Sequence, residues 1–301
     1  MHAYRISGLS VQSEIELPGA VPAMAAGEPD LAVRLGALPE ALADPSASGP
    51  AWQRSGGDFL LCVPGVGRFL ISDGNSITVD VDAAATPRDA SVFVLGSSIG
   101  IALHQRGALP LHGSCVARDG RALMLCGASG QGKSTTAAAL CKRGFTLVAD
   151  DISVIGFDAG KRLPIVWPDG RQLKLWRGAI DGLGLAAATP DPVRGGLDKY
   201  FVSPSAAATD PPILSAIYLL RTAPSASGVT IEQPRLPDAM RLLEEQTYRP
   251  RLRRELSTPK QMVPQAAAAL RHAGFFTFER PLGFDRLDEV LDALVSHWQT
   301  G

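Results

Sequence analysis

The chain has 301 residues, of which 46% are hydrophobic and 20% are charged, and its formal net charge is −1 at pH 7. These values are typical of a globular protein with a substantial core, long enough for two domains, and they argue against a disordered chain. Because positive charge is not in excess, the composition gives no reason to expect nucleic acid or an anionic membrane as a partner.

The N-terminal residues 1–17 mix Arg5, Glu14 and Glu16 among apolar residues, a pattern unlike the apolar core of a signal peptide. The longest apolar runs have the length of a strand and are too short to span a bilayer. The four cysteines show no C-x-x-C spacing, and three of them lie in apolar segments: Cys62, Cys115, Cys126 and Cys141. We therefore expect a cytoplasmic protein whose thiols are reduced and pack in the core, rather than zinc ligands or disulfides.

Short alternating or apolar runs dominate the first part of the chain. They cover residues 31–35, 59–63, 68–72 and 76–81, and turn signals such as Asp73-Gly74-Asn75 separate them. Such runs predict strands joined by hairpins. We therefore predict a small β-rich N-terminal domain over residues 1–88.

A second domain is predicted over residues 89–301, and it mixes helices with strands. A helical period over residues 89–106 ends at Gly107 and is expected to join the two domains. Expected strands cover residues 111–117, 122–126, 146–149, 153–157, 163–167, 213–221 and 229–232. Expected helices cover residues 135–142, 237–246, 260–271 and 286–298, and residues 181–193 are expected to form a loop that could act as a flap.

The most informative stretch of the chain fits the phosphate-binding pattern G-x-x-x-x-G-K-[ST]. It runs Gly127-Ala128-Ser129-Gly130-Gln131-Gly132-Lys133-Ser134 and continues into Thr135. An apolar strand precedes it and a helix follows, so backbone N–H groups and the helix N-terminus would converge on a polyphosphate. Lys133 would reach the outer phosphates of ATP, and the Ser134 hydroxyl would bind Mg²⁺. A chance match is disfavoured because the chain has only six lysines and both flanks fit.

Two aspartates, Asp150 and Asp151, follow an apolar strand after the phosphate-binding loop. Strand ends next to such a loop lie within reach of a bound triphosphate. One carboxylate would hold Mg²⁺, and the other would accept a proton from an attacking hydroxyl. The alternative, a solvated turn, is disfavoured by the apolar strand and the upstream loop.

His112 stands at the start of a strand that leads into the same sheet. A lone histidine is more often structural than functional, so the pattern alone favours the structural alternative for His112. The other four histidines have no comparable setting.

The run PLHGSCVARDGRALMLCGASGQGKSTTAAALCKRGFTLVADDISVI resembles the core of the HPr kinase/phosphorylase family, which pairs a His-Gly before the loop with an Asp-Asp segment after it. The resemblance is specific over residues 108–157. It implies a P-loop core of the HPr kinase/PEP carboxykinase type. It also implies that His112 assists the catalytic carboxylate, that Asp150 is the general base, that Asp151 and Ser134 position Mg²⁺, and that Lys133 neutralises phosphate charge.

The chain also departs from that family. Thr135 stands where HPr kinases usually have glutamate, and their later signature E-x-R-G-x-G-I-I-N-V is not found, the nearest text being Arg177-Gly178. We therefore do not expect HPr as the acceptor or an efficient reverse reaction. The opening YRISGLSVQSEIELPG, with DLAVRLG, resembles instead the HPr-kinase-like proteins of lasso-peptide clusters, which implies the C-terminal serine of a precursor peptide as one candidate acceptor.

Two further features have both a functional and a structural interpretation. The arginine-rich run 249–254 would either grip an acceptor anion or form a solvated or subunit-contacting surface, and the second interpretation is favoured. Lys199 would either stabilise the transferred phosphoryl group or lie on the surface, and again the second is favoured.

The sequence therefore predicts an ATP- and Mg²⁺-dependent serine kinase that acts on a peptide or small protein. The alternatives are an ATPase or small-metabolite kinase, and a nucleotide sensor without catalytic activity; the intact Lys133, Ser134, Asp150 and Asp151 disfavour the sensor. A homo-oligomer is compatible with the sequence, and the number of subunits stays open.

Overall fold

The computed structural model describes residues 1–300 except 26, 159, 161, 170–171, 186–191, 194–197, 205, 224–227 and 257–258. The chain forms two compact units. The first unit comprises Met1–Pro110 and Tyr248–Met262, and the second comprises Leu111–Thr247 and Val263–Gly301. The first unit thus continues past the boundary expected at residue 88, because the helical segment that follows packs on the N-terminal sheet.

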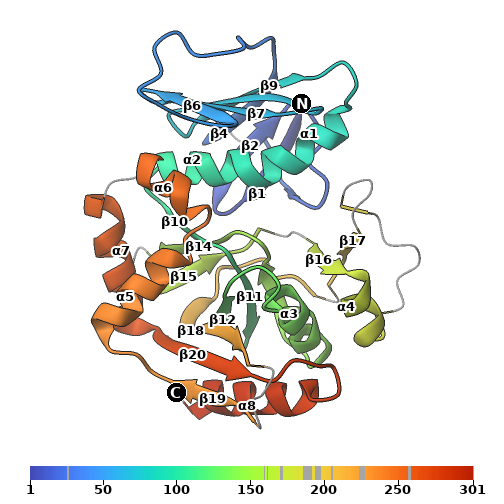
Figure 1. The fold of residues 1–301 in the computed structure, drawn as a ribbon, viewed down its shortest axis with the longest axis vertical. Helices are drawn as coiled ribbons and strands as arrows, with labels where there is room; N and C mark the ends of the chain where they lie inside the picture. Colours follow the sequence, from blue (N-terminus) through green and yellow to red (C-terminus); the bar gives the residue numbers. More distant parts are fainter. Residues whose placement is uncertain are drawn as a thin grey trace. The chain divides into compact units, whose positions relative to one another are not determined.

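The first unit is built on one twisted sheet (Figure 1), with strand order β3-β1-β2-β4-β9-β8-β7-β6-β5. Its strands are β1 (His2–Ile6), β2 (Leu9–Ser13), β3 (Val21–Pro22), β4 (Leu31–Leu35), β5 (Ala47–Gly49), β6 (Trp52–Ser55), β7 (Asp58–Val63), β8 (Gly67–Ser72) and β9 (Ser76–Val81). The β-rich character expected of this region is confirmed, and the four runs named from the sequence correspond to β4, β7, β8 and β9. Alternate residues of β8 are buried, as expected for a strand with one face in the core.

A helical segment follows the sheet, but it is not the single helix expected over residues 89–106. It consists of α1 (Pro87–Phe93), the π-helical turn η1 (Val94–Ser98) and α2 (Ile99–Gln105). Thr86 caps α1 through a reciprocal pair of hydrogen bonds with Asp89. The ring of Tyr248 lies so close to Gly100 that a Cβ there would be 2.5 Å from it, so this turn of the segment accommodates the close approach of an aromatic side chain. The short helix α6 (Pro250–Leu256) also belongs to this unit.

The second unit is a mixed α/β structure, which confirms the expected fold class. Strand β10 (Leu109–Leu111) leads into it. The other strands of the main sheet are β11 (Gly113–Arg118), β12 (Arg121–Cys126), β13 (Thr146–Ala149), β14 (Ser153–Phe157), β15 (Pro164–Trp167), β18 (Ile213–Thr222), β19 (Thr230–Glu232) and β20 (Gly274–Arg280). A separate hairpin pairs β16 (Leu173–Trp176) with β17 (Lys199–Val202).

The directions of the strands in the main sheet determine which strand ends, and therefore which candidate site residues, lie close together. Strand β11 is antiparallel to both β12 and β13, so β12 and β13 run in the same direction. Strand β18 is parallel to β12, and β20 is parallel to β18. The start of β11 and the carboxyl ends of β12, β13, β18 and β20 therefore lie at one edge of the sheet.

The helices of this unit are α3 (Lys133–Lys142), α4 (Arg177–Gly182), α5 (Leu236–Glu245) and α8 (Leu287–Thr300), together with α7 (Pro259–His272), whose first four residues belong to the first unit. Leu140 of α3 and Leu294 of α8 are fully buried in a cluster that also contains Phe145 and Trp298. Residues 181–182, expected in a loop, belong to α4, and residues 186–191 of that expected loop lie outside the described part of the chain.

The cysteines and the helices bear on two further expectations. All four thiols are free; Cys115, Cys126 and Cys141 are buried, and burial raises the pKa of Cys126 to about 12. Among the helices of the described residues, none combines the length and the apolar character that crossing a bilayer requires.

Candidate active site

The phosphate-binding loop connects β12 to α3 through a series of glycines in the left-handed or extended positive-φ region. Gly127, Gly130 and Gly132 have φ values of 143°, 85° and 78°. Residues with a Cβ adopt such conformations at a cost, so the glycines of the motif are required by the backbone itself. A Cβ on Gly127 would stand 2.8 Å from the carbonyl oxygen of Leu220. The loop therefore packs against the main chain of Leu220 at this point, where a residue larger than glycine would not fit.

Lys133 begins α3 and folds back over the loop. Its Nζ donates to the carbonyl oxygens of Gly127 at 2.7 Å and of Ala128 at 3.1 Å. The residue is only 8% exposed, and burial lowers the pKa of its ammonium group. Its acceptors are neutral carbonyls, so the lysine can exchange them for a phosphate oxygen, with which an ammonium forms a stronger bond.

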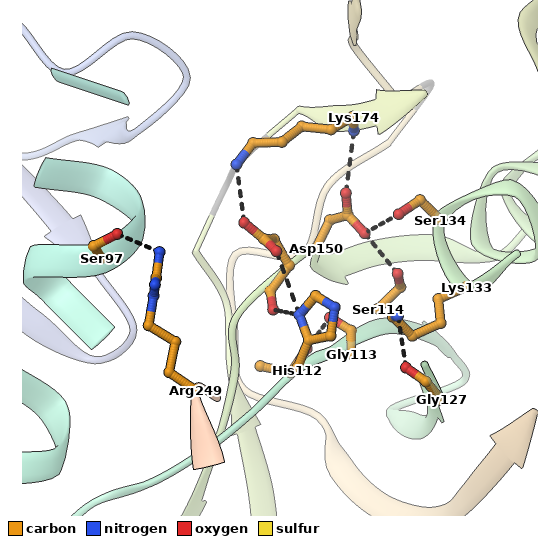
Figure 2. A network of polar contacts seen from close by, with 12 residues as sticks. Ser97, His112, Gly113, Ser114, Gly127, Lys133, Ser134, Asp150, Lys174 and Arg249 are labelled. Atoms are coloured by element: carbon orange, nitrogen blue, oxygen red, sulfur yellow. Dashed lines mark hydrogen bonds and ion pairs between the residues drawn. The ribbon is translucent and has the colours of Figure 1, made fainter. Parts of the chain in front are cut away.

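Asp150 lies at the carboxyl end of β13, and its carboxylate is almost completely buried, with 2% of the residue exposed. Oδ1 accepts from the Ser134 hydroxyl at 2.9 Å and from the Ser114 hydroxyl at 2.5 Å (Figure 2). Oδ2 accepts from the backbone N–H of Lys174 at 3.1 Å. Three donors from three different elements thus fix this carboxylate beside the first turn of α3.

Asp151 faces a different set of partners. Its carboxylate receives the Lys174 ammonium at 3.0 Å and lies 3.4 Å from Nδ1 of His112. Nδ1 also lies 3.1 Å from the Asp151 carbonyl oxygen, and because both partners are acceptors, this nitrogen must carry the proton. Asp151 adopts φ 75°, a left-handed conformation that aspartate tolerates better than most residues.

The charge state of Asp151 follows from this environment. Burial by itself would raise the pKa of its carboxyl group, but the hydrogen bond from His112 and the charge of Lys174 outweigh burial and hold the pKa well below its usual value. The carboxylate is therefore ionised throughout the physiological range.

These groups surround one pocket that is partly open to solvent. Of the residues predicted to bind nucleotide or to act in catalysis, those that line it are His112, Ser129, Gly130, Gly132, Lys133, Ser134, Thr135, Asp150 and Asp151. Gly127, Ala128 and Gln131 belong to the loop but do not line the pocket. The predicted convergence of the loop, the histidine and the two carboxylates is present in the structure.

Several lining residues were missed or set aside by the sequence interpretation. Lys174, Leu175 and Trp176 come from β16, and Lys199 comes from β17, where its Nζ lies 5.8 Å from the Trp176 ring centroid. The sequence favours a surface position without function for Lys199, whereas the structure places it at the pocket. Three of the six lysines of the chain, Lys133, Lys174 and Lys199, thus line this pocket, but no local pattern in the sequence marks Lys174 or Lys199.

The arginine-rich run 249–254 belongs to the first unit, and two of its side chains are engaged there. Arg249 donates to the Ser97 hydroxyl at 2.6 Å (Figure 2), and Arg253 is buried with Nη1 3.0 Å from the Met262 sulfur. These contacts give both side chains a structural role within that unit.

The residues at the pocket fit ATP with Mg²⁺. In the described part of the chain, no three His, Cys, Asp or Glu residues are grouped closely enough to hold a metal by themselves. Mg²⁺ commonly binds through one or two carboxylates together with substrate phosphates and water, so a complete protein cage is not required. The Ser134 hydroxyl and the Asp150 carboxylate, 2.9 Å apart, offer the oxygen ligands or water-binding groups for such a site.

A family described as "SynChlorMet cassette protein ScmC" matches residues 84–174, less than half of the chain. No curated protein matches the chain. A similar solved structure is the Hpr(Ser) kinase/phosphatase from Coxiella burnetii, with 13% sequence identity, 64% of this chain and 91% of that chain covered, and a TM-score of 0.30. At this identity and TM-score, the likeness does not establish a shared activity.

Proposed function

We propose that the second unit is an ATP-dependent phosphotransferase that passes the γ-phosphoryl group to a hydroxyl, most specifically a serine of a peptide or small protein. The observation that carries this proposal is the single pocket in which Lys133 and Ser134 of the phosphate-binding loop face two aspartates and a histidine. Phosphoryl transfer needs positioning and charge neutralisation more than covalent help, and these residue types supply both.

The loop and the start of α3 would hold the triphosphate. Backbone N–H groups and Lys133 would bind its oxygens, and Ser134 with Asp150 would hold Mg²⁺. The metal, when bound, neutralises charge on the phosphates. Asp150 is suited to this task because it is buried and already oriented by the hydroxyl groups of Ser134 and Ser114.

Asp151 would accept the proton of the acceptor hydroxyl. In the transfer, the hydroxyl oxygen forms a bond to the γ-phosphorus while the bond from that phosphorus to the β–γ bridging oxygen breaks, and ADP leaves with the electron pair. The proton of the hydroxyl passes to the Asp151 carboxylate, which His112 and Lys174 hold in place. The sequence interpretation gave Asp150 the role of base and Asp151 that of metal ligand; the contacts of the two carboxylates support the exchange of those roles.

Two isosteric variants test this assignment. Asp151→Asn is expected to bind ATP·Mg²⁺ like the wild type and to lose phosphoryl transfer by roughly 10²- to 10⁴-fold, the usual contribution of a positioned base. Asp150→Asn is expected to weaken the Mg²⁺ dependence of nucleotide binding as well as transfer. Binding by titration calorimetry and transfer with γ-labelled ATP separate the two. The opposite pattern would restore the original assignment.

The acceptor is tested by incubating the chain with γ-labelled ATP and three classes of acceptor. These are serine-containing peptides, including one that ends in serine as the lasso-peptide resemblance implies, small hydroxylated metabolites, and water alone. Label on a peptide hydroxyl supports the proposal. Label on a metabolite or release of phosphate in the absence of acceptor would replace it by a metabolite kinase or an ATPase, and binding without turnover would indicate a sensor.

A further inference from the structure

Arg280 ends β20 and has an unusual environment for an arginine. The residue is only 5% exposed, and its Nε has no hydrogen-bond partner. Its other nitrogens donate to carbonyl oxygens: Nη2 to Gln131 at 2.9 Å and Nη1 to Pro281 at 3.4 Å. Among the described residues, no carboxylate pairs with this guanidinium, and burial lowers its pKa. A buried cation without a counter-charge is costly, so an anion that binds nearby would offset that cost.

The sheet places this cation beside the phosphate-binding loop. Strands β12, β18 and β20 run parallel, so Arg280 at the end of β20 and Gly127 at the end of β12 share one edge. A Cβ added to Gly132 would stand 2.5 Å from Nη2 of Arg280, so the guanidinium is packed directly against the loop. Arg280 does not line the pocket itself, which means that it must act through the loop.

The hydrogen bond to Gln131 has a consequence for the next amide. The chain contains no cis peptide bond among its described residues, and in a trans peptide the C=O and the following N–H point in opposite directions. Because the Gln131 carbonyl points at Arg280, the Gly132 N–H points away from it, and Gly132 is one of the residues that line the pocket. A cation on the carbonyl also polarises the peptide and makes the amide a stronger donor.

We infer that Arg280 is a positioning residue for nucleotide binding. It fixes the Gln131–Gly132 peptide so that the Gly132 N–H points toward the pocket, and the polyphosphate of the ligand balances the charge of its guanidinium. The inference rests on the proposed function in that the ligand is a nucleoside polyphosphate. It goes beyond the proposed function by giving a role to Arg280, which lies outside the loop motif and 149 positions from Gln131 along the chain.

The test measures binding of ATP·Mg²⁺ and ADP·Mg²⁺ by titration calorimetry, with no acceptor or turnover required. Arg280→Met is expected to weaken both affinities roughly 10- to 100-fold, the effect of losing hydrogen bonds to a charged group. Arg280→Lys keeps the charge but not the planar fork, so its loss should be smaller, roughly three- to tenfold.

The matched control is Arg143→Met, which removes an arginine of the same unit that is paired with Asp288 and Asp292 on α8. Its nucleotide affinity should equal that of the wild type. The melting temperature of each variant without nucleotide is measured first, so that every titration is run on folded protein. If Arg280→Met does not fold, the Arg280→Lys result decides.

Each outcome bears on the inference. Wild-type affinity in a folded Arg280→Met, or in Arg280→Lys when that variant decides, overturns the inference and leaves the proposed function in place. An equal loss in Arg143→Met also overturns it, because the effect would then follow from any change in charge or stability of the unit. If the wild-type chain binds neither nucleotide, the proposed function fails and the inference fails with it.

Discussion

The pocket has two unlike sides. Its closed side is formed by Lys133 and Asp150, which are buried, and by Ser134, which is half-buried, and each of the three makes side-chain hydrogen bonds within the chain. Its open side, formed by His112, Asp151 and Trp176, is partly exposed: the side chains of the first two are 37% and 26% exposed, and Trp176 is 53% exposed.

This difference matches two different tasks. A triphosphate is the same in every turnover, so a preorganised site made of fixed main chain and buried charge suits it. An acceptor must enter, react and leave, so a half-exposed wall with an aromatic side chain and several charges suits it better. Lys174 joins the sides, since its backbone N–H holds Asp150 and its ammonium holds Asp151.

The largest effect is expected on the closed side. Lys133→Met removes the only cationic side chain of the loop, and with it the charge that would neutralise the phosphates. The value of kcat/KM for phosphoryl transfer should therefore fall by roughly 10³-fold. The control is Lys142→Met, in the last turn of the same helix, where Nζ donates to the Leu183 carbonyl away from the pocket. It should leave kcat/KM unchanged. Equal activity in the two variants would mean that the closed side does not bind the transferred group.

The rigidity of the closed side depends on the core beneath it. Leu140 of α3 is fully buried, and Leu140→Ala should lower the free energy of unfolding by about 3 kcal/mol through lost burial and a cavity. Denaturant unfolding measures this loss. Leu282→Ala, at a residue 57% exposed in the same unit, should stay within about 0.5 kcal/mol of the wild type. A small loss at Leu140 would show that α3 is held loosely.

On the open side, a smaller and more selective effect is expected. Trp176→Ala should raise KM for a peptide acceptor roughly tenfold with little change in kcat, because the ring would contribute contact area but no chemistry. Affinity for ATP·Mg²⁺, measured on the same variant by calorimetry, should not change. A loss of ATP affinity of similar size would place the nucleotide, rather than the acceptor, against Trp176.

The residues of the pocket also differ in how far the sequence predicts them. The loop motif, the flanking strand and helix, and the position of Asp150 and Asp151 after an apolar strand are local patterns, and the structure confirms that their residues meet. Strand direction explains why: β11 starts, and β12 and β13 end, at the same edge. The roles of the individual residues stay predictions.

The residues and strands that the sequence did not predict depend on contacts between segments that are far apart in the chain. Lys174 and Trp176 lie on a short hairpin whose strands β16 and β17 are separated by more than twenty residues, so no local pattern marks it. Strand β20 was also missed, and with it Arg280, whose partner Gln131 is far away in sequence. In the first unit, the close contact between Tyr248 and Gly100 likewise joins segments that are far apart in the sequence.

The smallest effect concerns the pH dependence of stability. The folded pKa of Asp151 lies below the value of about 3.9 for an unfolded aspartate, because the partners His112 and Lys174 outweigh burial. The ionised form therefore stabilises the folded state above that value, and the contribution is lost as pH falls below about 4 toward the folded pKa. Asp151→Asn lacks the charge at every pH, so it should be less stable than the wild type by roughly 1 kcal/mol at pH 6, as for a partly exposed ion pair.

Urea unfolding of both proteins between about pH 6 and pH 3 measures this difference, and other carboxyl groups cancel because they titrate in both. The gap should be constant down to about pH 5 and should shrink below about pH 4. A gap that widens on acidification would mean that the folded state binds a proton at Asp151 more tightly than the unfolded chain does. The hydrogen bond from His112 and the charge of Lys174 would then not outweigh burial in the folded state.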